Sequence, residues 1–183
     1  MKLPGPDRFD TVVRFDREVD RRLDGLRGHP VIDRLFFAAS EAGNFSVIWH
    51  GLAWFAVARD PRQWRRAVVV SAALAVESGL VNGVIKSFFK RDRPTVAEPR
   101  AHRLRQPKTS SFPSGHASAA MMAAALLARR SRLGPLYYGL GAIVALSRAY
   151  VRIHHASDVV GGALVGAMLG RIARRLPIDR FLR

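Results

Sequence analysis

The chain has 183 residues, enough for one domain and hardly for two, and its lack of cysteine excludes disulfides and cysteine-ligated metals. Lysine and arginine outnumber aspartate and glutamate by 30 to 14, but many basic residues stand in short runs between apolar blocks. That arrangement is typical of the flanks of membrane spans and argues against nucleic acid as a partner.

The first 43 residues are rich in charge but nearly neutral, with eight basic and eight acidic side chains. Apolar residues recur at three- and four-residue spacing from Val12 to Leu26, which predicts an amphipathic helix that ends near Gly28–Pro30. A second short helix is expected over Val31–Ala42. Neither is long and apolar enough to span a bilayer, so we expect both to lie on the membrane surface or to pack on the bundle.

Five apolar blocks follow, and a bilayer asks for about 20 residues per helix, with about 17 at the low end. The blocks are Ala42–Ala58, Ala67–Ile85, Phe112–Ala128, Leu133–Ser147 and Val159–Gly170. The last two are short, and either alone would also fit a buried helix of a soluble protein. Five in series, each with a basic residue just beyond at least one end, favour a helical membrane bundle.

We therefore expect an all-α fold, a polytopic membrane helical bundle of about five transmembrane helices. Amphipathic N-terminal helices would occupy residues 1–43, the transmembrane domain residues 44–176, and a basic C-terminal tail residues 177–183. No secretory signal peptide is apparent at the N-terminus.

Some residues within the blocks stand out. Gly162, Gly166 and Gly170 recur every four residues, which lets a neighbouring helix approach closely, so we interpret them as packing residues. Glu77 is an ionisable residue inside a block, where a functional role and a hydrogen-bonded structural role are equally compatible with the sequence. Asn82 lies one turn before Lys86 and could share its face.

Three polar clusters fall at block ends that share one side of the membrane if successive blocks alternate in direction. The basic loop Lys86–Pro113 lies on that side and is unusually long for a compact domain, which favours a functional role.

The first cluster contains Lys86 and Arg93, seven residues apart. Seven residues are about two helical turns, so both can lie on one face of a helix. Pro94 would then end that helix or set the turn after it. Two cations there suit a phosphate, Arg as a fork and Lys as a point charge. A basic run that only flanks a span would look the same.

The second cluster is Pro113–Ser114–Gly115–His116, at the start of the third block. Proline fits the first turn of a helix, and a helix N-terminus binds anions through its backbone N–H groups. Ser114 could add a hydroxyl donor, and His116 could donate a proton near neutral pH. A helix cap with an incidental histidine is the alternative interpretation.

The third cluster is Ser147–Arg148, followed by His154 and Asp158. Arg148 supplies another phosphate fork. His154 and Asp158 are four residues apart, about one helical turn, so their side chains can meet. A carboxylate on one imidazole nitrogen fixes the tautomer, which makes His154 a candidate nucleophile. A His/Asp pair at the interface without chemistry remains the alternative.

Together the clusters supply three cations, a helix N-terminus, two histidines and a carboxylate, which is what phosphoryl transfer through a phosphohistidine needs. The acidic residues near them are Asp92, Glu98 and Asp158, and they form no obvious carboxylate cluster for a two-metal site. We therefore expect no metal and no other cofactor.

The three clusters resemble, position by position and in order, the signature motifs of the type-2 phosphatidic acid phosphatase family. The resemblance covers about Gly43 to Arg175 and implies a membrane lipid phosphatase. Many members of that family have a sixth span near the N-terminus, where this chain has charged amphipathic sequence instead.

The resemblance also implies roles for the motif residues. Three cations bind the phosphate oxygens, namely Lys86, Arg93 and Arg148. Ser114 and the Gly115 backbone N–H complete the phosphate cradle. His154 attacks phosphorus, His116 protonates the leaving oxygen and then helps water, and Asp158 orients His154.

Five spans would place the N-terminus on the active-site side. The opposite side holds loops 59–66 and 129–134 and residues 171–183 after the last block, with four, three and five basic residues. That distribution favours a cytoplasmic location for this opposite side and an extracytoplasmic active site in the cell membrane.

The motifs read the phosphate and not the lipid, so several substrates stay open. They are polyprenyl pyrophosphate or phosphate, phosphatidic acid, phosphatidylglycerol phosphate and a lipid-linked sugar phosphate. Two alternatives are a catalytically silent binder of anionic lipids and a vanadium-dependent haloperoxidase, whose motifs are similar but which is typically soluble and larger.

Overall fold

A computed structural model of the chain describes residues 6–95, 109–129 and 131–176, so the basic tail expected at 177–183 lies outside the described residues. Seven α-helices and no strand occur among them. The helices are α1 (Pro6–Asp24), α2 (Pro30–Ala42), α3 (Val47–Arg59), α4 (Trp64–Ser78), α5 (Gly115–Ala128), α6 (Gly134–Tyr150) and α7 (Ala156–Arg175). Each predicted apolar block corresponds to one helix of α3–α7, and both predicted N-terminal helices are present.

The helix that contains α4 is longer than its α-helical part. It begins with a short turn at Pro61 and continues beyond Ser78 through a π-helical turn, Gly79–Val84, and a 3₁₀ turn, Ile85–Phe88. The resulting 28-residue helix and the 20-residue α7 are each long and apolar enough to cross a membrane. The apolar helix α5 is shorter.

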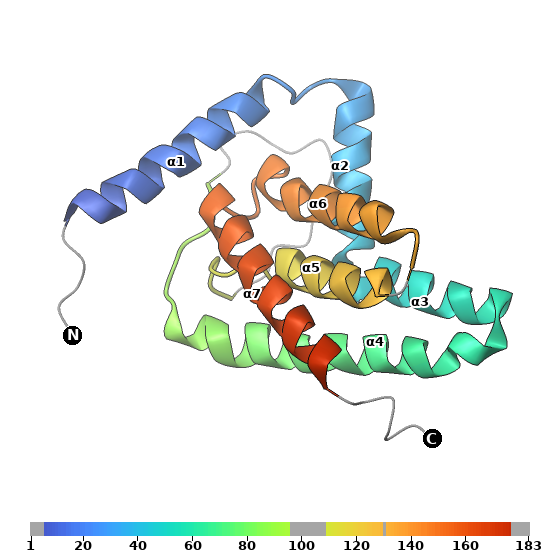
Figure 1. Cartoon of the computed structure of the whole chain (residues 1–183). Helices are drawn as coiled ribbons and strands as arrows, with labels where there is room; N and C mark the ends of the chain where they lie inside the picture. Colours follow the sequence, from blue (N-terminus) through green and yellow to red (C-terminus); the bar gives the residue numbers. More distant parts are fainter. Residues whose placement is uncertain (1–5, 96–108, 130, 177–183) are drawn as a thin grey trace.

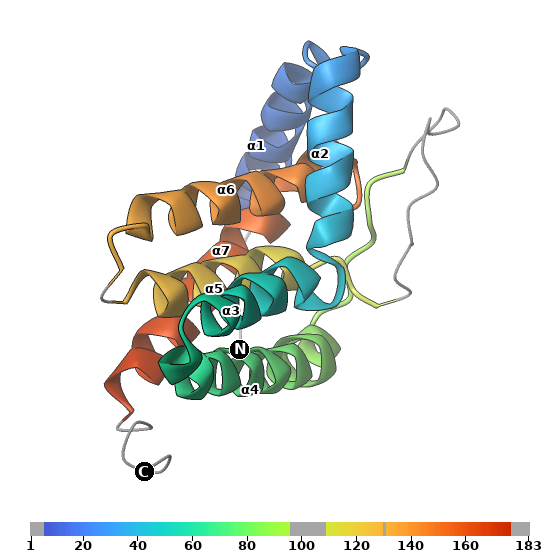
Figure 2. The same ribbon diagram turned by 90° about the vertical axis from the view of Figure 1, so that its right-hand side faces the viewer.

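Helix α5 occupies the centre of the bundle, between α6 and α4 and flanked by α3 and α7 (Figures 1 and 2). Alanine, leucine and methionine side chains all around α5 are buried, so this helix has no solvent face. Trp49 of α3, Leu74 of α4 and Val144 of α6 belong to the same buried cluster as α5. A helix that is apolar on every side is stable only when other helices surround it, which explains this position.

The contact between α5 and α7 depends on the predicted glycines. A Cβ atom on Gly162 would overlap the backbone of Ser114, and one on Gly166 would overlap the backbone of Ser118. A Cβ on Gly170 would lie 2.9 Å from the Cβ of Ala125. The interpretation of these glycines as packing residues is therefore confirmed.

The two N-terminal helices pack on one end of the bundle. Helix α2 crosses α6 (Figure 2). At this crossing Phe36 stacks on Tyr150 with ring centroids 4.4 Å apart. Helix α1 contacts α6 and α7, and its Asp20 and Asp24 form ion pairs with Arg152 in the loop between those helices. These contacts place α1 and α2 against the residues of the third cluster.

Candidate active site

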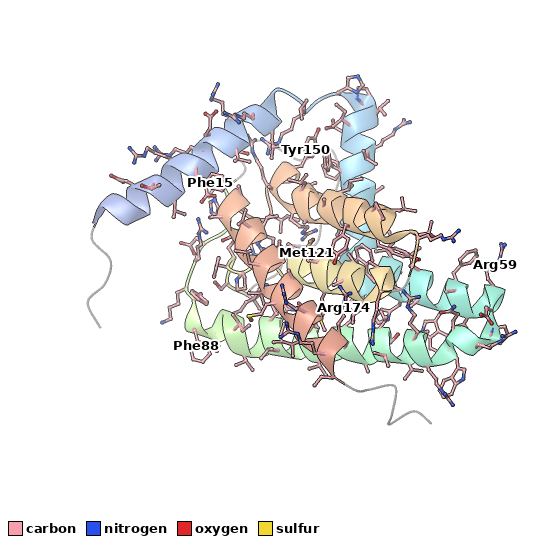
Figure 3. All side chains as sticks on the ribbon, in the orientation of Figure 1. Phe15, Arg59, Phe88, Met121, Tyr150 and Arg174 are labelled. Atoms are coloured by element: carbon pink, nitrogen blue, oxygen red, sulfur yellow. The ribbon has the colours of Figure 1, made fainter. Side chains whose placement is uncertain are left out.

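The three clusters meet at one end of the bundle, as the alternation of the blocks predicts. Phe88, at the end of the long helix, and Arg59, at the end of α3, mark opposite ends of the bundle (Figure 3). At the Phe88 end lie the N-terminus of α5, the C-terminus of α6 and the loop that leads into α7.

A cavity of about 530 Å³ lies at this end, and five predicted site residues line it. They are Lys86, Gly115, His116, Arg148 and His154. Lys86 and Arg148 are 6% and 2% exposed, so both cations are held away from bulk water. Buried cations of this kind favour an anionic ligand, because water screens their charge only weakly.

The other three predicted site residues surround the cavity without lining it. Asp158 is buried behind His154. Arg93 reaches His154 with its guanidinium. Ser114 is fully buried and caps α5, because its hydroxyl accepts the N–H of Ala117 at 3.5 Å. Seven of the eight predicted site residues thus contribute a side chain or a backbone group to the site. The Ser114 hydroxyl instead faces its own helix.

Arg93 reaches the site by a different route from the one its spacing predicts. The helix that holds Lys86 ends at Phe88, and Phe89 is extended, so Arg93 does not share a helical face with Lys86. The prediction that Pro94 ends this helix or sets the turn directly after it is therefore wrong, because the helix ends at Phe88. Phe89 to Thr95 instead run as irregular backbone beside the loop before α7, where Arg93 donates to the carbonyl of Ile153 at 3.0 Å.

Pro113 also lies outside the helix it was expected to begin. Ser114 is the N-cap of α5, so Pro113 precedes the cap and the first helical residues are Gly115 and His116. The Ser114 N–H donates to the carbonyl of Asp158 at 3.0 Å, which fixes the start of α5 against the start of α7. The second and third clusters are thereby joined through backbone.

His154 is buried, with 3% of its surface exposed, and its two ring nitrogens have different neighbours. Nε2 lies 3.2 Å from a guanidinium nitrogen of Arg93. Since Arg93 can only donate, Nε2 accepts and the ring proton resides on Nδ1. That nitrogen faces Ser111 Oγ at 3.4 Å and Asp158 Oδ2 at 3.7 Å.

The predicted pairing of His154 with Asp158 is present, but the two residues do not lie one turn apart on the same helix. Helix α7 begins at Ala156, so His154 belongs to the preceding loop and Asp158 to the first turn. Asp158 Oδ2 also accepts from the His155 backbone N–H at 2.8 Å, which forms half of a capping box. The carboxylate therefore both caps α7 and faces the imidazole.

Burial lowers the pKa of His154 to about 4. The Asp158 carboxylate acts in the opposite direction, while Arg93, Arg148 and Lys86 add to the lowering. At neutral pH the imidazole is therefore uncharged and its Nε2 lone pair is available for attack on phosphorus.

Sequence reasoning missed two residues that hold Asp158. Ser111 Oγ donates to Asp158 Oδ2 at 2.6 Å, and Arg91 donates to Asp158 Oδ1 at 2.5 Å and to Ser157 Oγ at 2.8 Å. Arg91 also pairs with Asp16 of α1 at 2.7 Å. The only signal in the sequence was their position beside the motifs, which does not reveal a partner.

His116 is held by the connection between α2 and α3. Its Nε2 lies 3.0 Å from Asn44 Oδ1, and a Cβ on Gly43 would come within 2.8 Å of its Cδ2. Arg148 donates to the Ser40 hydroxyl on α2. The α2 end and its following turn therefore form part of the cavity wall, a role that sequence reasoning also missed.

The described residues contain no group of three or more histidine or acidic side chains that could hold a metal ion. The expectation that the chain needs no metal stays a prediction.

The sequence model of the PAP2 superfamily matches residues 64–181. The chain belongs to the PAP2 superfamily. Decaprenylphosphoryl-5-phosphoribose phosphatase of Mycobacterium tuberculosis (strain H37Rv) is 35% identical over 133 residues, 73% of each chain. Undecaprenyl-diphosphatase BcrC of Bacillus subtilis (strain 168) is 26% identical over 84% of this chain and 79% of its own.

Two solved PAP2 structures share the fold. The transmembrane phosphatidylglycerolphosphate phosphatase from Bacillus subtilis has a TM-score of 0.69 and 20% identity, covering 94% of this chain and 88% of its own. Aquifex aeolicus LpxE has a TM-score of 0.69 and 25% identity, covering 87% and 94%. The expected all-α membrane bundle and the expected family are confirmed, and this PAP2 protein is a phosphatase. The number of spans stays a prediction.

Proposed function

We propose that this protein hydrolyses a phosphate monoester or diphosphate of a lipid in the cell membrane through a phosphohistidine at His154. The observation that carries the proposal is the neutral, buried imidazole whose Nε2 faces Arg93 while Nδ1 faces Asp158. The names of its relatives give prenyl-linked and other lipid phosphates as their substrates, which supports a lipid substrate here.

In the first step, His154 Nε2 attacks phosphorus and the bond from phosphorus to the leaving oxygen breaks. His116 supplies a proton to that oxygen, and Asp158 stabilises the positive charge that forms on the imidazole. In the second step, water attacks phosphorus, His116 takes a proton from the water, and the P–N bond breaks to release phosphate. Lys86, Arg93 and Arg148 hold the phosphate oxygens in both steps, with backbone N–H groups of Gly115.

We also propose the domain organisation and orientation. Residues 44–176 form the transmembrane phosphatase domain, and residues 1–43 form a cap of amphipathic helices at its active-site end. The basic loops at the far end face the cytoplasm, so the site is extracytoplasmic.

The test is phosphate release by the purified protein in detergent with EDTA present. The substrate panel is prenyl diphosphate, prenyl phosphate, phosphatidic acid, phosphatidylglycerol phosphate and a prenyl-linked phosphoribose. We expect turnover that survives EDTA and is abolished by His154→Ala. His155→Ala is the matched control, because its ring does not line the cavity, and it should keep most of the activity.

Absence of release from every lipid by folded wild type would contradict the proposal and favour a silent binder of anionic lipids. Loss of turnover on EDTA addition would contradict the metal-independent mechanism alone.

A further inference from the structure

The cavity that contains His154 has a second wall that the proposed mechanism does not use. Glu77, Ser78 and Asn82 line it from the long helix. Glu77 precedes Lys86 by nine residues, about 13 Å along an ideal helix axis, so this wall extends away from the cations toward the middle of the bundle.

Glu77 is the unusual residue of this wall. It is 1% exposed, and its Oε1 has no hydrogen-bond partner in the part of the chain that the structure describes. A buried carboxylate oxygen without a donor is costly, so such groups are retained where a ligand or another group supplies one. Glu77 lines the cavity, where the Ser118 hydroxyl is one donor near its carboxyl group and a ligand hydroxyl would be another.

Asn82 connects this wall to the predicted phosphate cradle. Its Nδ2 donates to Ser78 Oγ at 3.2 Å. Its Oδ1 would lie 2.7 Å from a Cβ atom on Gly115, so the amide oxygen touches the first turn of α5. The ligand atoms that follow a phosphate held at Gly115 would therefore find an amide oxygen first and the Glu77 carboxylate beyond it.

The lack of a lysine or arginine on this wall discriminates between ligands. Among the described residues that line the cavity, the lysine is Lys86 and the arginine is Arg148. The wall of Glu77, Ser78 and Asn82 adds one acidic side chain and no lysine or arginine. A second phosphate placed against this wall would meet acceptor oxygens and no lysine or arginine to balance its charge. Hydroxyl groups would instead donate to the acceptors that the wall presents.

We propose that Glu77 and Asn82 bind hydroxyl groups next to the scissile phosphate. The favoured substrates are then phosphate monoesters whose alcohol carries neighbouring hydroxyls, in a lipid-linked sugar or a glycerol, in preference to prenyl diphosphates. This inference rests on the proposed phosphatase function and narrows its substrate class.

The experiment measures kcat/KM of the full-length protein for four substrates. They are a prenyl-linked pentose 5-phosphate, phosphatidylglycerol phosphate, a prenyl diphosphate and a small aryl phosphate without hydroxyls. Of the two hydroxylated substrates, we expect the preferred one to have a kcat/KM about tenfold or more above that of prenyl diphosphate. The reason is that a site built for hydroxyls rejects ligands that lack them. The ranking of the sugar and glycerol substrates identifies the source of the hydroxyls.

Two variants test the wall itself. Glu77→Gln replaces the carboxyl group with an amide, and Asn82→Ala removes the amide. Each should reduce the ratio of kcat/KM for the hydroxylated substrate to kcat/KM for prenyl diphosphate by about tenfold. Ser87→Ala is the control, because Ser87 is exposed on the same helix and does not line the cavity, and its ratio should equal that of wild type. Asn82 is exposed, so its variant keeps the test valid if Glu77→Gln fails to fold.

A wild-type preference for prenyl diphosphate, or an unchanged ratio in Asn82→Ala and in folded Glu77→Gln, would overturn the hydroxyl site while leaving a working phosphatase. Failure of wild type on all four substrates, the aryl phosphate included, would instead overturn the proposed function.

Discussion

At the residue scale, His154 combines two requirements that are usually in conflict. A nucleophilic imidazole must be uncharged, and the cations that hold a phosphate disfavour its protonation, as does burial. Asp158 favours the charged form, which becomes useful only after attack on phosphorus. Its 3.7 Å separation from Nδ1, with Ser111 in contact with both groups, leaves the free imidazole neutral.

The acid limb of the pH profile tests this balance. Burial lowers the pKa of His154 to about 4, so the free enzyme stays neutral at this ring from pH 7 down to about pH 5 and becomes protonated below. We expect protonation of His154 to lower kcat/KM only as pH falls through about 4. Because a phosphate monoester takes up its own second proton near pH 6, ¹⁵N NMR titration of the histidines, assigned with His154→Gln, gives the ring pKa directly.

The same shift has a stability consequence. The folded pKa lies below the ordinary value of 6.5, so between pH 6.5 and pH 4 the unfolded chain binds a proton that the folded chain does not. The contribution of His154 therefore lowers the free energy of unfolding as pH falls through that window. A ring that titrates near 6.5 in the folded protein would contradict both expectations.

Ser111 offers a second test at this scale. Ser111→Ala removes the hydroxyl between His154 and Asp158 and should lower kcat by about tenfold, with KM nearly unchanged, because it loosens the ring orientation. Ser110→Ala is the neighbouring control, since Ser110 Oγ accepts from the backbone N–H of Arg91 and, among the described residues, makes no hydrogen bond to His154 or Asp158. A change confined to KM would show that Ser111 acts on substrate binding instead.

At the element scale, helix α1 reaches the site through Asp16, which is 7% exposed. Asp16 accepts from Arg91 at 2.7 Å and from the Ser157 backbone and hydroxyl at 2.7 and 2.9 Å. Arg91 in turn holds Asp158. Asp16 is thus a positioning residue, which acts on His154 through two intervening side chains.

We expect Asp16→Asn to lower kcat by about tenfold with little change in KM, and Asp16→Glu to restore part of it. Asp20→Asn is the matched control on the same helix, because Asp20 pairs with Arg27 and Arg152 and not with Arg91. NMR of His154 should detect a shifted ring signal in Asp16→Asn and not in Asp20→Asn. Equal losses in both variants would mean that α1 contributes only general stability.

The glycines of α7 give an element-scale prediction about stability. Gly166→Ala places a methyl group on the backbone of Ser118 and should destabilise the protein by about 1–3 kcal/mol, as overpacking does. Gly139→Ala in α6 meets open space, so it should be neutral or slightly stabilising. Thermal unfolding in detergent compares the two, and equal Tm values would contradict the close approach of α5 and α7.

The sequence predicts elements and motif residues better than it predicts their contacts. The seven helices follow from apolar periodicity and block length, because each pattern is local. Arg93 shows the limit, since its seven-residue spacing suits a helical face but the helix ends at Phe88. The partnership of Asp16 with Arg91 joins residues 75 apart in sequence, and no local pattern encodes it.

At the scale of the whole molecule, one end of the bundle carries the site and the other carries basic loops. The absence of cysteine makes this arrangement easy to test with single introduced cysteines. Thr109 and Arg62 are both exposed and lie at the site end and the opposite end. We expect a membrane-impermeant maleimide to label Thr109→Cys in intact cells, and Arg62→Cys only after permeabilisation. The reverse pattern would place the active site in the cytoplasm.

The contacts of Asp16 also govern the order in which the site can be completed during synthesis. Its partners Arg91 and Ser157 follow it by 75 and 141 residues. Helix α1 therefore leaves the ribosome long before its partners exist, and its buried carboxylate is satisfied only once α7 has begun to insert. A nascent chain lacks both this network and its nucleophile until residues 154–158 have been made, so phosphatase activity cannot precede the first turn of α7.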